Sequence, residues 1–215
     1  VRARGALRKG SRITAATQLL TYSDMTIFEN RGRRTLNEAS TVEEFLGLRA
    51  DLGAFALGSY FAELLETVSA EEYPDPPVLQ LGLNSLYALS RALCPPEQIK
   101  AVFELRLMCL AGYEPDLSCC ARCGAPEPAE PWLSLRGGAV YCAQCRGASS
   151  SAVTPLLPET LAAMRHVVNA DPKRIFSFTL GDAGRRQLAR VCEEYTAMQL
   201  ERGFASLDYW KKVKD

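Results

Sequence analysis

The sequence predicts an α+β protein with two short strands first, helices next, and a cysteine-rich module set into the helical part. Three observations support this fold class. Apolar and polar residues surround a glycine-containing turn near residue 32, apolar residues recur with helical spacing over residues 41–111, and two Cys-x-x-Cys pairs lie within residues 117–147. The 215 residues are 47% hydrophobic and 23% charged, as in an ordinary globular protein.

Two strands are predicted on either side of the polar turn at residues 30–34. Residues 19–28 are rich in Thr, Tyr, Ile and Phe, and residues 35–39 form a second short run. β-Branched and aromatic residues favour strands, and Gly32 suits a tight hairpin turn. Because two strands alone are marginally stable, we expect them to be the remnant of a larger β-unit.

Helices are predicted from residue 41 to residue 111. The Thr-Val-Glu-Glu sequence at 41–44 is a capping box. Prolines at 74–77 and 95–96 divide the stretch into separate helices. The last of them, residues 97–111, is apolar nearly all round, which is typical of a central buried helix.

The remaining sequence predicts two more helices after the cysteine module. Pro158 begins one of them, which carries the only histidine, His166, and the other covers residues 184–202. We interpret His166 as a structural residue. The chain is therefore divided into four parts, namely residues 1–40, 41–116, 117–147 and 148–215, the last of which packs on the helical domain.

Composition favours a cytoplasmic protein. No apolar run approaches the ~20 residues that a membrane span needs, and the start of the sequence lacks the apolar core of a signal segment. Eight cysteines in such a protein argue against a disulfide framework. Cys94, Cys109 and Cys192 lie in apolar helical stretches, so we interpret them as buried thiols.

Four other cysteines have the spacing of a zinc site. Cys120 and Cys123 form the first Cys-x-x-Cys pair, Cys142 and Cys145 form the second, and 18 residues separate the pairs. This spacing is typical of a four-thiolate Zn²⁺ site. Glycines at 137–138 predict a hairpin that brings the pairs together. Four thiolates leave no open coordination position, so the site is expected to be structural.

Two alternatives concern the same cysteines. The pairs could be redox-active or hold iron, although the βαβ context of a thioredoxin-like motif is lacking. Cys119 could replace Cys120 as a ligand, but it would give a Cys-x-x-x-Cys spacing, so Cys120 is preferred.

Charge is unevenly distributed, although the net charge is zero. Residues 1–34 hold eight basic and two acidic residues, residues 35–116 hold four and thirteen, and residues 117–215 hold thirteen and ten. This asymmetry suggests a polyanion-binding face, because phosphate neutralisation needs several cations on one surface. A solvated loop is the alternative. The candidate DNA-binding residues are Arg2, Arg4, Arg8, Lys9, Arg12, Arg31, Arg33 and Arg34.

Several stretches, taken in order and spacing, resemble the bacterial RecO family of recombination mediators. The matching stretches are residues 3–9 with 11–12, 20–28 with 37–39, 103–107, 111–117 and 120–125. The resemblance covers almost the whole chain. It implies an N-terminal OB-fold, of which residues 1–40 are a remnant lacking about 30 to 40 family residues before Val1, followed by a helical domain with a zinc-ribbon-like module.

The resemblance also implies a function in DNA repair. It implies binding to single- and double-stranded DNA, annealing of complementary strands, and loading of the RecA recombinase with the partners RecR and SSB, close to the bacterial nucleoid. No enzyme is implied, and the sequence contains no P-loop, H-E-x-x-H or G-x-S-x-G motif. The alternative from another class is a zinc-ribbon adaptor that binds protein and has no DNA affinity.

The helix at 97–111 is the predicted binding place for a partner. The acidic, aromatic-ended tail of SSB needs an apolar pocket and a cation. Phe103 and Leu107 are the predicted walls, and Lys100 or Arg106 is the predicted cation. The alternative for Arg106 is a buried or snorkelling side chain that pairs with an acid.

Overall fold

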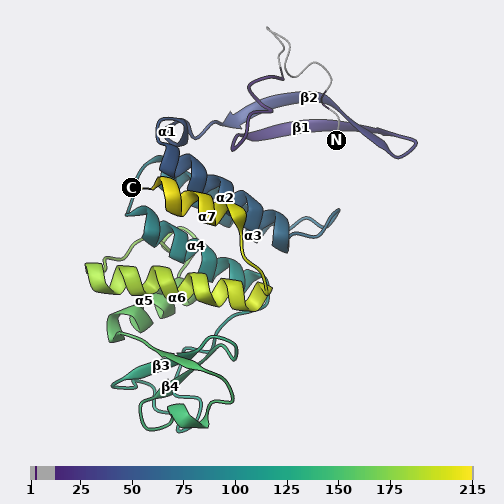
Figure 1. The fold of residues 1–215 in the computed structure, drawn as a ribbon. Coiled ribbons are helices and arrows are strands. Elements are labelled where there is room, and N and C mark those ends of the chain that lie inside the picture. Colours follow the sequence, from purple (N-terminus) through teal and green to yellow (C-terminus); the bar gives the residue numbers. More distant parts are fainter. Residues whose placement is uncertain (1–2, 4–12, 215) are drawn as a thin grey trace.

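The computed structural model describes residues 3 and 13–214 (Figure 1). The described part contains a two-stranded sheet, a three-stranded sheet and seven α-helices, so the predicted α+β fold class is confirmed. The helices form the middle of the molecule, and the two sheets lie at opposite ends of it. None of the described helices is long and apolar enough to cross a membrane.

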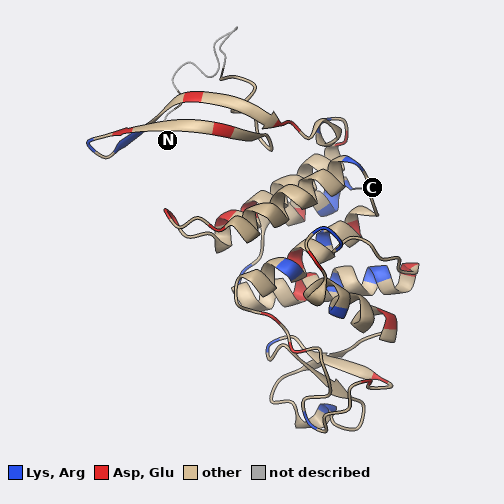
Figure 2. Cartoon of the chain, turned by 180° about the vertical axis from the view of Figure 1, so that it is seen from behind, with Lys and Arg blue, Asp and Glu red and all other residues tan. Residues whose placement is uncertain are grey.

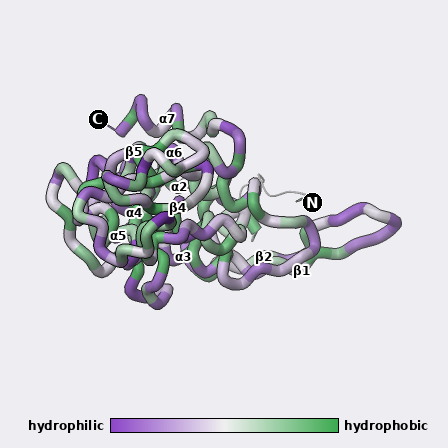
Figure 3. The backbone as a smooth tube through the Cα atoms, turned by 90° about the horizontal axis from the view of Figure 1, so that it is seen from below, coloured by the Kyte–Doolittle hydropathy of each residue, from purple (hydrophilic) through white to green (hydrophobic). Residues whose placement is uncertain are grey.

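The two-stranded sheet is the predicted N-terminal hairpin. Strands β1 (Tyr22–Asn30) and β2 (Arg33–Glu43) are antiparallel. Arg31 and Gly32 connect them with φ angles of 49° and 72°, as a type I′ turn requires. The hairpin projects to one side of the helices, and its tip is hydrophilic (Figure 3).

The helices follow the hairpin and then resume after the cysteine module. They are α1 (Leu46–Arg49), α2 (Leu52–Val68), α3 (Pro76–Ser90), α4 (Pro96–Leu110), α5 (Pro158–Asn169), α6 (Asp182–Leu200) and α7 (Ala205–Val213). The carboxylate of Asp51 accepts a hydrogen bond from the Ala54 amide at 2.8 Å and so caps α2. Asp75 caps α3 in the same way through Val78.

The predicted capping box at residues 41–44 is wrong. These residues continue β2 as far as Glu43, where Thr41 pairs with Ser23 and Glu43 with Tyr22. The Glu43 carboxylate accepts a hydrogen bond from the Phe45 amide at 3.0 Å, so it serves the turn that leaves the strand. Pairing with β1 therefore overrides the local helix signal.

Helix α4 is the centre of the molecule, as its sequence predicts. It contacts α2, α3, α5 and α6, and almost every side chain from Gln98 to Met108 is buried. The rings of Phe103 and Phe61 are stacked with centroids 4.2 Å apart. The C-terminal helix α7 packs on α2, where Trp210 is only 3% exposed.

The second sheet contains two strands of the cysteine module and one strand that follows the module. Strands β3 (Pro131–Ser134) and β4 (Ala139–Cys142) form the predicted antiparallel hairpin, and β5 (Val153–Pro155) pairs with the other edge of β3. The module leaves the helices after α4 and returns to them before α5. Its two ends are therefore fixed on neighbouring helices.

Candidate metal centre and basic hairpin

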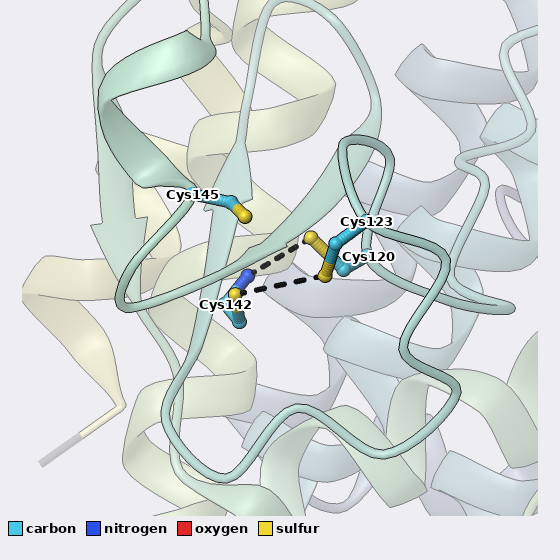
Figure 4. Close-up of side chains that lie close together, drawn as sticks. All are labelled: Cys120, Cys123, Cys142 and Cys145. Carbon is cyan, nitrogen blue, oxygen red and sulfur yellow. Dashed lines mark hydrogen bonds between the residues drawn. The ribbon is translucent and has the colours of Figure 1, made fainter.

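The four predicted cysteines converge on one point (Figure 4). The sulfur atoms of Cys120, Cys123, Cys142 and Cys145 all lie within 4.8 Å of one another, and those of Cys123 and Cys142 are 4.0 Å apart. A tetrahedral Zn²⁺ with sulfur ligands at about 2.3 Å places its sulfurs about 3.8 Å apart. The cluster therefore has close to the dimensions of a four-thiolate metal site.

The first Cys-x-x-Cys pair is folded as a tight knuckle. The Gly124 amide donates to the carbonyl of Cys120 at 2.8 Å, and the Cys120 amide donates to the carbonyl of Ala125 at 2.8 Å. Gly124 has a φ of 73°, a left-handed conformation that glycine adopts without strain. The knuckle turns Cys120 and Cys123 towards the same point.

The second pair lies at the end of β4. The Cys145 amide donates to the carbonyl of Cys142 at 2.9 Å, which closes a second turn. A further hydrogen bond, from the Ala121 amide to the Val140 carbonyl at 2.8 Å, joins the first knuckle to β4. The backbone thus fixes both pairs relative to each other.

Cys120, and not Cys119, belongs to the cluster. Burial works to raise the pKa of the Cys120 thiol, but backbone hydrogen bonds from Cys123, Cys142 and Arg122 lower it to about 6. This favours the thiolate, which is the form that binds metals. Cys119 lies outside the cluster, and its sulfur is 3.7 Å from the hydroxyl of Ser118.

Arg165 on α5 attaches the module to the helices. Its guanidinium donates to the carbonyl of Leu117 at 2.7 Å, to that of Pro126 at 2.6 Å and to that of Ser118 at 3.1 Å. It also pairs with the exposed carboxylate of Glu127 at 2.7 Å. The segment around the first knuckle is therefore wrapped around one guanidinium. No sequence motif indicates this role.

Helix α6 provides a second attachment. The hydroxyl of Tyr195 donates to the carbonyl of Tyr113 at 2.8 Å, and the amide of Gln199 donates to the carbonyl of Leu135 at 2.7 Å. A side chain at Gly138 would come within 2.9 Å of the Tyr195 hydroxyl, so this turn needs glycine. The module is thus held from two helices.

The predicted DNA-binding residues fall into three groups. Those before residue 13 lie outside the described residues, namely Arg2, Arg4, Arg8, Lys9 and Arg12. Arg31 and Arg33 are exposed at the hairpin tip, where neither forms an ion pair with another described residue. Figure 2 shows this basic tip. Arg34 differs, because it pairs with Glu29, Glu71 and Glu72.

The predicted partner pocket on α4 is wrong. Phe103 and Leu107 are 0% exposed, and Lys100 is 1% exposed. The ammonium group of Lys100 forms ion pairs with Glu104 at 3.0 Å and Glu193 at 2.9 Å. A helix that is apolar on all sides is covered by its neighbours, so it has no free face for a peptide.

Arg106 also has an internal role. Its guanidinium donates to the carbonyl of Val167 at 3.3 Å and to that of Val168. Both carbonyls lie in the last turn of α5, where the helix dipole favours a cation. Arg106 therefore pairs with the end of a helix, and the alternative expectation of an acidic partner is wrong as well.

Comparison with known proteins identifies the family. The family described as "Recombination protein O C terminal" matches residues 49–208, from the end of α1 into α7. The chain is 31% identical over 211 residues to the DNA repair protein RecO of Acetivibrio thermocellus, covering 98% of this chain and 84% of that protein.

Two further relatives carry the same name. The RecO protein of Heliobacterium modesticaldum is 31% identical over 198 residues, which cover 89% of this chain and 71% of the relative. The RecO protein of Alkaliphilus metalliredigens is 28% identical over 212 residues, which cover 98% of this chain and 86% of the relative. The match thus includes the hairpin, the helices and the cysteine module, and the chain belongs to the RecO family of DNA repair proteins.

Proposed function

We propose that this chain is a DNA-binding recombination mediator. It binds single- and double-stranded DNA, promotes annealing of complementary strands, and helps to load RecA with RecR and SSB as partners, in the bacterial cytoplasm near the nucleoid. Membership of the RecO family supports the role in repair. The observation that carries DNA binding is the position of Arg31 and Arg33, which are exposed at the tip of a projecting hairpin.

The charge distribution supports contacts with phosphate groups. Arg31 and Arg33 follow a segment whose basic residues have almost no acidic neighbours, whereas residues 35–116 carry a large acidic excess. The acidic part repels DNA and suits protein partners. Among the described residues, no helix is placed at the hairpin tip to read bases in a groove, so we expect binding to be sequence-tolerant and to depend on salt.

We infer that residues 1–40 belong to an OB-fold, a five-stranded barrel. Residues 41–116 and 148–215 then form the helical domain, and residues 117–147 form its zinc-ribbon-like insertion. The exposed apolar residues of the hairpin support this reading. Met25, Ile27 and Phe28 are 47%, 47% and 61% exposed, and further barrel strands would cover such side chains.

We propose that the cysteine cluster holds one structural Zn²⁺ ion. All four donors are cysteine sulfurs whose spacing fits a tetrahedral site, and thiolates select zinc or iron–sulfur centres over harder ions. When zinc is bound, four sulfur ligands complete its tetrahedral coordination and leave no open position for catalysis. Cys120 and Cys123 would hold it from the first knuckle, and Cys142 and Cys145 would hold it from the second, since the four side chains lie close together (Figure 4).

The DNA proposal is tested by removing the two exposed arginines. Arg31→Ala/Arg33→Ala should flatten the log–log dependence of affinity on salt by about 1.4 for single strands and about 1.8 for duplex, because each lost phosphate contact removes ~0.7 or ~0.9. The matched control is Lys173→Ala/Arg174→Ala, which removes the same charge from exposed side chains between α5 and α6. The control should leave the slope nearly unchanged.

Two results would contradict the proposal in different ways. An unchanged slope in Arg31→Ala/Arg33→Ala means that DNA does not contact the hairpin tip. Absence of any salt-dependent DNA affinity in the intact chain favours the zinc-ribbon adaptor that binds protein only.

A further inference from the structure

Arg34 at the hairpin tip has every guanidinium nitrogen engaged. Its Nε donates to the Glu29 carboxylate at 2.9 Å, its Nη1 donates to Glu71 at 3.0 Å, and its Nη2 pairs with Glu72. These contacts, with Glu29 and Glu72 as the main contributors, raise the pKa of Arg34 further above its ordinary value. One cation is therefore surrounded by three carboxylates, and this site differs from the free arginines beside it.

The three carboxylates have two different origins. Glu29 lies directly opposite Arg34 in the register of β1 and β2, so this pair stabilises the hairpin itself. Glu71 and Glu72 come from the loop between α2 and α3, more than 30 positions further along the chain. Their side chains are 85% and 67% exposed. The α2–α3 loop therefore reaches the hairpin tip through Arg34.

The conformation of this loop is unusual at the contact. Glu72 has a φ of 69°, a left-handed backbone that is uncommon for residues other than glycine. Its neighbour Tyr73 is 79% exposed, so core packing of that side chain does not impose the turn. The loop therefore places the carboxylates of Glu71 and Glu72 against Arg34. These contacts make Arg34 less available to an external anion than its neighbours at the tip.

We propose that Glu71 and Glu72 form an autoinhibitory clasp that occupies Arg34 until DNA phosphates displace it. This inference rests on the proposed DNA binding by the hairpin. A carboxylate engages guanidinium in the same planar, charge-assisted way as a phosphate does. Three of the five N–H donors of Arg34 are taken by carboxylates, so a phosphate competes with the charge of the acids and gains the full set of donors only by displacing them.

The clasp adjusts DNA binding without blocking it. Exposed ion pairs are weak and are screened by salt, so the acids can be displaced. A single phosphate competes poorly with two carboxylates that are already in place. A strand held by Arg31 and Arg33 presents its next phosphate to Arg34 at a high effective concentration. The device therefore favours strands long enough to span the whole tip.

The test is the Glu71→Gln/Glu72→Gln variant of the full chain, titrated with labelled single-stranded DNA between about 50 and 200 mM salt. Glutamine keeps the shape of each side chain and removes its charge. Affinity should rise roughly two- to five-fold at the lowest salt, within the range of weak exposed ion pairs. The salt slope should steepen by about 0.7, which corresponds to one added phosphate contact.

The matched control is Glu38→Gln/Glu66→Gln, which removes two exposed acids that form no ion pair with a described cation. This control should give a smaller gain in DNA affinity and no change in the salt slope. Adding Arg34→Ala to Glu71→Gln/Glu72→Gln should abolish the steeper slope, because the new contact belongs to Arg34.

The clasp is overturned if Glu71→Gln/Glu72→Gln behaves like the control pair. It is also overturned if that variant binds DNA more weakly than the intact chain, since the loop would then be a support that positions the hairpin. Failure of the proposed function is seen separately, because Arg31→Ala/Arg33→Ala then leaves the salt slope unchanged whatever the clasp variant does.

Discussion

The ammonium group of Lys100 lies 3.0 Å from the carboxylate of Glu104 one turn further along α4, and both side chains are completely buried. Glu193 from α6 adds a second carboxylate at 2.9 Å. The hydroxyl of Tyr60 on α2 donates to Glu104 at 2.8 Å. Three helices therefore meet at one buried ionic network, each member of which has a partner.

This network predicts a large and specific stability effect. Lys100→Met should lower the free energy of unfolding by ~3–5 kcal/mol, because it leaves the Glu104 carboxylate buried without a counter-charge. Lys100→Met/Glu104→Leu should recover most of the loss, since apolar residues of similar volume can replace a buried pair. Denaturant titration measures both variants. Equal losses in the single and double variants would contradict this expectation, because removing Glu104 would then relieve no uncompensated buried charge.

The same network predicts a contribution of Glu193 at acidic pH. Burial acts to raise the pKa of Glu193, but Lys100 and Lys211 lower it below its ordinary value of 4.5. A carboxylate with a lowered folded-state pKa stabilises the fold above the unfolded value and loses that stabilisation as the pH falls through the folded value. The stability difference between the intact chain and Glu193→Gln should therefore be constant near neutrality and shrink below about pH 4.5. A pH-independent difference would contradict this.

Metal removal should affect one part of the molecule. We expect one zinc per chain, which contributes on the order of 10 kcal/mol to folding of its own module. Cys142→Ser should unfold β3 and β4 while the helices keep their circular dichroism signal. Cys119→Ser is the control and should retain zinc, because Cys119 lies outside the cluster. Elemental analysis with well under one zinc in the intact chain would refute the assignment.

Arg106 is predicted to act on stability and not on partner binding. Arg106→Ala should cost about 1.5–3 kcal/mol, the range for a hydrogen bond to a charged group, because the last carbonyls of α5 lose their cation. Arg186→Ala, at an exposed position of α6, is the control and should change little. Thermal denaturation measures both variants. Equal melting temperatures of Arg106→Ala and Arg186→Ala would contradict the capping role of Arg106.

Arg165 is predicted to hold the metal module in place. Arg165→Ala removes donors to three backbone carbonyls and should destabilise the docked module by roughly 2–3 kcal/mol. The measurement is the rate at which a chelator removes zinc, which should increase. Glu127→Gln breaks only the ion pair of Arg165 with a carboxylate that is 82% exposed. Its rate of zinc removal should therefore stay close to that of the intact chain. Equal rates in all three proteins would count against the anchor.

Sequence reasoning succeeded where the signal is local. The hairpin, the helices and the convergence of four sulfurs depend on turns, prolines and spacing that act over a few residues. The capping box at residues 41–44 failed because the pairing of Thr41 with Ser23 decides the conformation there. Local pattern competes with tertiary contacts, and at the end of β2 the tertiary contact is the stronger influence.

The roles of charged residues in the interior were not predictable in the same way. The apolar pattern of α4 correctly indicates burial, but it does not reveal what Lys100 and Arg106 bind. Their partners on α5 and α6 are more than 60 residues away. The contact between Arg34 and the α2–α3 loop is also distant in sequence, and single-sequence periodicity carries no information on such pairs.

The packing of α7 on α2 has a consequence for synthesis of the protein. Ser206 at the start of α7 contacts Glu63 on α2 across a separation of 143 residues. While the chain emerges from the ribosome, α2 is therefore complete long before the helix that covers it. The cysteine module closes through local contacts and can fold in that interval, but the helical core must wait for α7. Nascent chains thus carry exposed apolar surface until α7 has been synthesised, a period in which chaperones protect against aggregation.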